Sequence, residues 1–110
     1  MEYKLIQTTV EKIVRMLVNA EYEDLYKFDK YKDCTPNEIE VAINDWGNMT
    51  LPPTEAFERI DVYETDDANH VRIDFDLWFD NNISDLTLKC SIYKSTDFEE
   101  SFAIEGIRML

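Results

Sequence analysis

Residues 70–94 alternate between apolar and polar side chains more regularly than any other part of the chain. This every-second-residue pattern predicts β-strands with one buried face. Asn81-Asn82 tolerates the positive φ of a two-residue turn, so the pattern predicts a β-hairpin. With Asp80 opposite Ile83, the polar face pairs Trp78 with Asp85, Asp76 with Thr87, Asp74 with Lys89 and Arg72 with Ser91. A slip of one residue would bury this charged set, so the register is strongly specified.

Three helices are predicted before the hairpin. The first begins at a Thr8–Glu11 capping box or nearer Glu2, and its apolar face consists of Ile6, Val10, Ile13, Val14 and Leu17. Tyr22, Leu25 and Tyr26 continue the helical spacing over a short second helix. The third starts at Thr35, Pro36 and Glu38, ends in a left-handed cap at Gly47, and has an inner face of Ile39, Ala42, Ile43 and Trp46.

The remaining strands complete a segregated α+β pattern. After a helical turn over 54–57, residues 58–65 form a strand with Ile60 and Val62 inward and Asp61 outward. The last strand is predicted over 102–109, with a bulge at Gly106. We therefore expect one α+β domain over 1–110, with N-terminal helices packed on a four-stranded antiparallel sheet. This order of elements resembles the cystatin-like or nuclear-transport-factor-like roll.

Three motifs resemble a family of small bacterial α+β domains. They are L-P-P-T-E-A-F-E-R-I-D-V-Y-E at 51–64, D-F-D-L-W at 74–78 and S-D-L-T-L at 84–88. The resemblance covers most of the chain and implies no catalytic residue. By its size and acidity, the chain also looks like the immunity proteins that bacteria pair with toxins.

The charge balance favours some partners and disfavours others. The chain has 24 acidic and 11 basic residues, a net charge of −13. Such a field repels nucleic acid and anionic membranes, so we expect neither as a partner, and a basic protein is the natural complement. No apolar run is long enough to span a bilayer and no secretory signal is visible, so the expected location is the cytoplasm. The oligomeric state is left open.

The candidate site is an acidic recognition patch on the predicted polar face. It consists of Asp74, Asp76, Trp78 and Asp85, because tryptophan is favoured at binding hot spots. Two alternatives remain: a solvated face partly neutralised by Lys89 and Arg72, or a carboxylate pair with one raised pKa. Asp61 of the preceding strand is included in the patch. The acids of the next turn and of a later loop are either ordinary solubilising charge or, if they flank this face, an extension of the patch, namely Glu64, Asp66, Asp67, Asp97, Glu99 and Glu100.

No catalytic residue, metal ligand or cofactor site is predicted. His70 is the only histidine and stands in no nucleophile motif. Cys34 and Cys90 lack a metal or redox spacing. The turn over 66–69 lacks the spacing of a calcium-binding EF-hand loop, and neither glycine lies in a phosphate-binding loop.

Together these features favour a non-catalytic acidic binding protein. The leading hypothesis is an immunity protein, or antitoxin, that neutralises a basic toxin domain such as a nuclease by direct binding. The alternative is a ligand-binding or enzymatic roll, with a helix-sheet pocket lined by Tyr22, Tyr26, Trp46 and Phe57. A third hypothesis is a dimer that uses the open sheet face as its interface.

Overall fold

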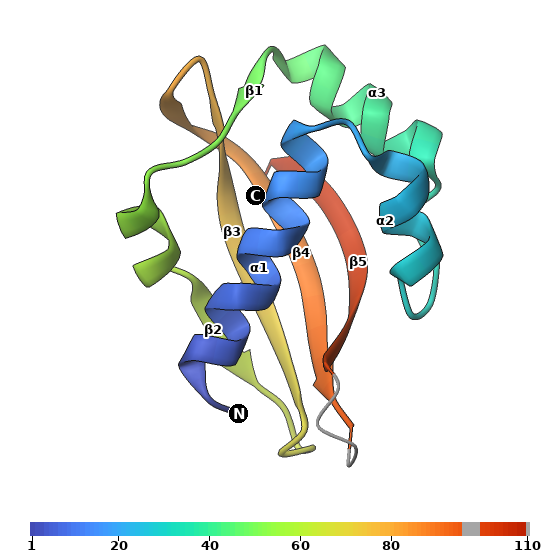
Figure 1. The fold of residues 1–110 in the computed structure, drawn as a ribbon, viewed down its shortest axis with the longest axis vertical. Helices are drawn as coiled ribbons and strands as arrows, with labels where there is room; N and C mark the ends of the chain where they lie inside the picture. The colour runs from blue at the N-terminus through green and yellow to red at the C-terminus, as the bar shows by residue number, and fades with distance from the viewer. Residues whose placement is uncertain (96–99, 110) are drawn as a thin grey trace.

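The computed structural model describes residues 1–95 and 100–109, in which three helices precede an antiparallel sheet (Figure 1). Helix α1 (Tyr3–Val18) begins at the earlier of the two predicted starts, with Glu2 as its N-cap. Its predicted apolar face is buried, together with Thr9. Helix α2 (Tyr22–Phe28) buries Leu25. The helical spacing of the sequence therefore located both helices.

Helix α3 (Pro36–Trp46) has the predicted capping box. The Thr35 hydroxyl accepts a hydrogen bond from the Glu38 N–H, and the Glu38 carboxylate accepts one from the Thr35 N–H, each at 3.2 Å. Trp46 is more exposed than predicted, at 39%, and its ring packs against Phe79. Gly47 ends the helix, but at φ 153° and ψ −150° rather than in the left-handed helical conformation. Glycine alone adopts such angles without strain.

The central hairpin joins β3 (His70–Phe79) to β4 (Asn82–Lys94). The predicted register is confirmed along most of its length, from Val71 opposite Ile92 to Asp76 opposite Thr87. The prediction for the turn was wrong. Positive φ angles fall on Asp80 and Asn81, so the turn lies one residue earlier than expected.

This shift changes the neighbours of Trp78, which pairs with Ile83 instead of Asp85. Asp76 and Trp78 are two positions apart on β3, whereas their partners Thr87 and Ile83 are four positions apart on β4. Strand β4 therefore contains a bulge of two extra residues. The even number preserves the alternation of buried and exposed side chains. Within the bulge, the Ser84 hydroxyl donates to the Leu77 carbonyl at 2.6 Å and accepts from the Leu86 N–H at 3.2 Å.

Two short strands share the free edge of β3, so the described part of the chain forms five strands rather than the four expected. Strand β1 (Met49–Thr50) pairs with residues 78–79, and β2 (Asp61–Glu64) pairs with residues 71–74. Between them lies a 3-10 helix, η1 (Thr54–Glu58), which shortens the strand predicted over 58–65. Strand β1 also holds the hairpin turn, because the Asn81 N–H donates to the Thr50 hydroxyl at 2.9 Å.

Strand β5 (Glu100–Met109) forms the opposite edge of the sheet and has a bulge at Glu105, one residue before the predicted position. The loop after α2 covers part of this edge. Asp29 is buried, and its Oδ2 accepts from the Ile104 N–H at 3.1 Å. Its Oδ1 accepts from the N–H groups of Tyr31 and Lys32 at 3.2 and 3.1 Å. Covering an edge in this way blocks further strand pairing.

Helix α1 crosses one face of the sheet, while α2 and α3 lie beside β5 (Figure 1). Phe57 of η1 enters the core and stacks on Phe75, with ring centroids 5.1 Å apart. The Gln7 side chain ties η1 to α1 by donating to the Phe57 carbonyl at 3.0 Å. The predicted α+β class, with N-terminal helices packed on an antiparallel sheet, is confirmed.

Candidate functional site

The polar side chains that alternate with the core residues form the second face of the sheet, which we call the outer face. Strand registers place three carboxylates there, Asp61, Asp74 and Asp76, and hydrogen bonds to Ser91 and Arg72 add Glu105. The cations of the face are Arg72, Lys89 and Arg108. The outer face is therefore nearly balanced in charge. The surplus of acid in the chain lies mostly elsewhere.

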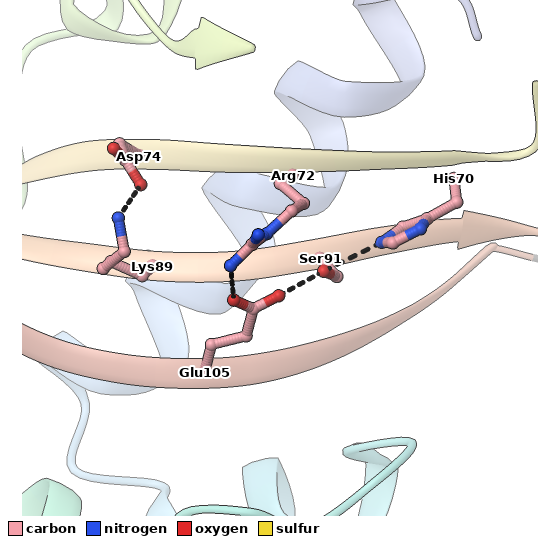
Figure 2. A network of polar contacts seen from close by, with 6 residues as sticks. All are labelled: His70, Arg72, Asp74, Lys89, Ser91 and Glu105. Atoms are coloured by element: carbon pink, nitrogen blue, oxygen red, sulfur yellow. Dashed lines mark hydrogen bonds and ion pairs between the residues drawn. The ribbon is translucent and has the colours of Figure 1, made fainter. Parts of the chain in front are cut away.

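At the His70 end, the outer face has a network of hydrogen bonds across three strands (Figure 2). The Ser91 hydroxyl donates to Glu105 at 2.5 Å and lies 2.9 Å from His70 Nε2. Arg72 completes the network with an ion pair to Glu105 at 2.6 Å. The bulge in β5 turns Glu105 toward this network. The sequence patterns did not single out Glu105 as a site residue. The available signal was the bulge predicted at the next residue, Gly106.

The network holds Ser91 in place and does not activate it. The single hydroxyl proton of Ser91 is given to Glu105, so His70 faces the lone pairs of Ser91 and acts as the donor. A serine nucleophile needs the reverse arrangement, with histidine taking the proton. Ser91 is also only 1% exposed.

Glu105 is held in its charged form. Its partial burial favours the neutral acid, but hydrogen bonds from Ser91 and Arg72 and the charges of Arg72 and His70 outweigh this. The pKa of Glu105 is consequently below its ordinary value. A general acid at neutral pH requires the opposite shift.

Asp74 lies in the middle of the outer face and is neutralised there. Lys89 Nζ pairs with its Oδ1 at 2.8 Å, and the side chains of Lys89 and Asp74 are only 18% and 13% exposed. Asp61 lies directly opposite Asp74 on β2 and is exposed. Lys89 therefore neutralises the Asp74 carboxylate, as the solvated-face alternative predicted. Arg72, which that alternative also expected to neutralise the aspartates, pairs with Glu105 instead. Asp74 contributes little free charge to a binding surface.

Asp76 and Trp78 occupy the other end of the outer face. Asp76 is exposed and accepts a hydrogen bond from the Thr87 hydroxyl at 2.9 Å. Trp78 is half-buried, and its indole Nε1 is buried with no hydrogen-bond partner among the described residues. An unpaired buried donor costs roughly 1–3 kcal/mol, and such costs concentrate at functional sites. Asp85 is exposed on the β4 bulge, no longer opposite Trp78.

A hollow of about 290 Å³ adjoins Trp78. It lies where β3 has no strand neighbour, between the residues paired with β1 and those paired with β2. No pattern in the sequence reveals this hollow, because it depends on the path of residues 51–60 away from the sheet. Its lining consists of Pro53, Glu55, Ala56, Arg59, Phe75, Asp76, Trp78 and Ile83.

The other predicted acids are not brought to this end. Glu64, Asp66 and Asp67 line a different hollow, with Met1 and Ile6 near the start of α1. Asp67 there accepts the Asn69 N–H at 2.8 Å and so stabilises its own turn. Glu100 is exposed at the start of β5. Asp97 and Glu99 lie outside the described residues.

The four aromatic residues of the alternative pocket are spread over the molecule. Phe57 is buried against Phe75, whereas Trp46 is exposed beside Phe79. Tyr22 and Tyr26 belong to α2, and Lys32 Nζ lies 5.6 Å from the Tyr26 ring centre. None of the four lines the hollow beside Trp78.

Within residues 1–95 and 100–109, no group of three or more His, Cys, Asp or Glu side chains is placed to hold a metal ion. No helix in the described part of the chain is both long and apolar enough to cross a membrane.

Comparison with known proteins places the chain in a family. No curated protein and no solved structure matches it significantly. The family model described as a domain of unknown function (DUF7668) matches residues 14–110, which is most of the chain. The chain therefore belongs to the DUF7668 family.

Proposed function

We propose that this protein is a non-catalytic binding protein of the immunity type, which neutralises a basic toxin domain such as a nuclease by direct contact. The observation that carries the proposal is the Trp78 end of the outer face. There a half-buried tryptophan, whose indole N–H has no partner among residues 1–95 and 100–109, borders a hollow and exposed carboxylates. Tryptophan in such a setting is typical of a hot spot.

The charge of the chain supports a basic partner. A net charge of −13 accelerates the encounter with a cationic protein, and the effect falls as salt screens it. Asp61 and Asp76 are exposed, and neither forms an ion pair with another described residue. They remain available to a partner. Asp74 does not, because Lys89 already pairs with it.

A pull-down from host lysate, followed by mass spectrometry, would identify candidate partners. The test is then made with the purified basic partner, by measuring Kd at low and moderate salt. Asp76→Lys and Trp78→Ala should weaken binding by about tenfold or more, as expected at a hot spot. The toxic activity of the partner should return in parallel.

The matched control is Glu40→Lys on α3. Glu40 is an exposed acid of α3 and belongs to none of the strands that form the outer face. Its substitution makes the same change in net charge as Asp76→Lys. It should alter the salt dependence and leave the affinity at moderate salt nearly unchanged. If Glu40→Lys weakened binding as much as Asp76→Lys, net charge alone would explain binding and the proposed surface would be wrong.

A further inference from the structure

The hollow beside Trp78 occupies an interruption in the edge of the sheet. Strand β2 pairs with β3 as far as Asp74, and β1 pairs with it again from Trp78. Residues 75–77 between them face no strand on that edge, because residues 51–60 turn away to form η1 (Figure 1). Tyr3 and Gln7 of α1 donate hydrogen bonds to the Phe57 carbonyl, and these bonds hold η1 next to α1. The interruption is therefore built into the path of the chain.

The size of the hollow limits its occupant. At about 290 Å³ it is at the lower end of the range for pockets that hold drug-sized ligands, roughly 300–1,000 Å³. It suits one long side chain better than a cofactor. Trp78, Ile83, Pro53 and Ala56 provide apolar surface for the stem of such a side chain.

The charged groups of the lining determine which side chain fits. Glu55 and Asp76 supply two carboxylates, and Arg59 supplies one cation. Arg59 lies four residues after Glu55, yet it forms no ion pair with Glu55 or Asp76. Both carboxylates thus remain open to an outside cation.

We infer that the hollow is an anchor pocket for one arginine side chain of the basic partner. This inference rests on the proposed function and specifies its central contact. An arginine stem packs on apolar surface, its planar head stacks on an indole ring, and its fork of N–H donors matches a carboxylate. A lysine would match the charge of the pocket but not the stacking.

The test uses the full chain and a blocked amino acid, N-acetyl-arginine amide. The chain has two tryptophans, so a ¹⁵N–¹H correlation spectrum contains two indole signals. Trp46→Phe assigns them. Titration with the probe should move the Trp78 signal saturably and leave the Trp46 signal in place. N-acetyl-lysine amide should bind more weakly.

Three variants then locate the contact. Glu55→Gln and Asp76→Asn should each weaken probe binding by about fivefold, the value expected for one partly exposed charge pair. Glu40→Gln removes an exposed acid of α3 that does not line the hollow, and it should have no effect. Absence of a saturable shift, or equal weakening by all three variants, would overturn the anchor pocket.

The outcome for the pocket is separable from that for the function. If the probe failed to bind while Asp76→Lys still abolished neutralisation of a basic toxin, the arginine pocket alone would fall. If the probe bound but no basic protein bound to the outer face, the pocket would stand and the proposed function would fall.

Discussion

Asp29 offers the sharpest test of what holds the β5 edge in place. It is a buried carboxylate, 2% exposed, that accepts three backbone hydrogen bonds. In Asp29→Ala both carboxylate oxygens, and with them all three hydrogen bonds, are lost. The N–H groups of Tyr31 and Lys32 belong to exposed residues and can turn to water, whereas the Ile104 N–H is buried and cannot.

The expected loss follows from that difference. Leaving the Ile104 donor unpaired costs about 1–3 kcal/mol, and each of the other two bonds contributes about 0.5–1 kcal/mol. Asp29→Ala should thus lower the free energy of unfolding by roughly 2–5 kcal/mol, a large share of the 5–15 kcal/mol typical of a domain. Asp29→Asn keeps an acceptor for the loop but turns an N–H₂ donor toward the Ile104 N–H, so it should cost about half as much.

Urea unfolding, followed by circular dichroism, measures these changes. Asp33→Ala is the control, because Asp33 is an exposed acid of the same loop, and it should change stability by less than about 0.5 kcal/mol. A loss in Asp29→Ala no greater than that in Asp33→Ala would show that the edge is held by packing alone.

Three further predictions concern other parts of the fold. Gly47→Ala should destabilise the protein by about 1–3 kcal/mol through backbone strain, because φ is 153° at this position. The added Cβ would lie 3.8 Å from Phe79, which is an ordinary contact, so no steric clash contributes. Urea unfolding measures the loss, and a neutral result would contradict the strain argument. Thr35→Ala removes half of the capping box and should cost about 1 kcal/mol in the same assay, while Thr35→Ser should cost much less. The lowered pKa of Glu105 stabilises the fold above the ordinary glutamate pKa of about 4.3, and this contribution is lost as pH falls through the lower folded value. Glu105→Gln should therefore flatten the fall in stability between neutral and acid pH, and an unchanged pH profile would refute the assignment.

The helices and the central register could be predicted because they depend on local patterns. The spacing of apolar residues in α1 and the capping box at Thr35 are written in neighbouring positions. The alternation from 71 to 92 fixed which side chains of β3 and β4 face α1. Burial of one face allowed no slip by a single residue.

The hairpin turn could not be placed from its own residues. Asp80-Asn81 and Asn81-Asn82 both tolerate positive φ, and the choice depended on β1. The Asp80 N–H donates to the Asn48 carbonyl, and the Asn81 N–H donates to the Thr50 hydroxyl. These partners lie about thirty residues earlier in the chain, so no local pattern reveals them.

The candidate site was only partly predictable for the same reason. Alternation placed Asp61, Asp74, Asp76 and Trp78 on one face, as the structure shows. It did not show that Arg72 would pair with Glu105, or that η1 would leave a hollow beside Trp78. Neither could it locate Asp29, whose partner Ile104 is 75 residues away.

The sequence by itself determined the class of fold, the faces of the main elements and the overall charge, because each depends on composition or on spacing within one element. Tertiary structure alone decided where the turn lies, which carboxylates remain free and where the sheet edge is interrupted. Those features arise when segments distant in the chain meet, and the free energy of each meeting depends on both partners at once.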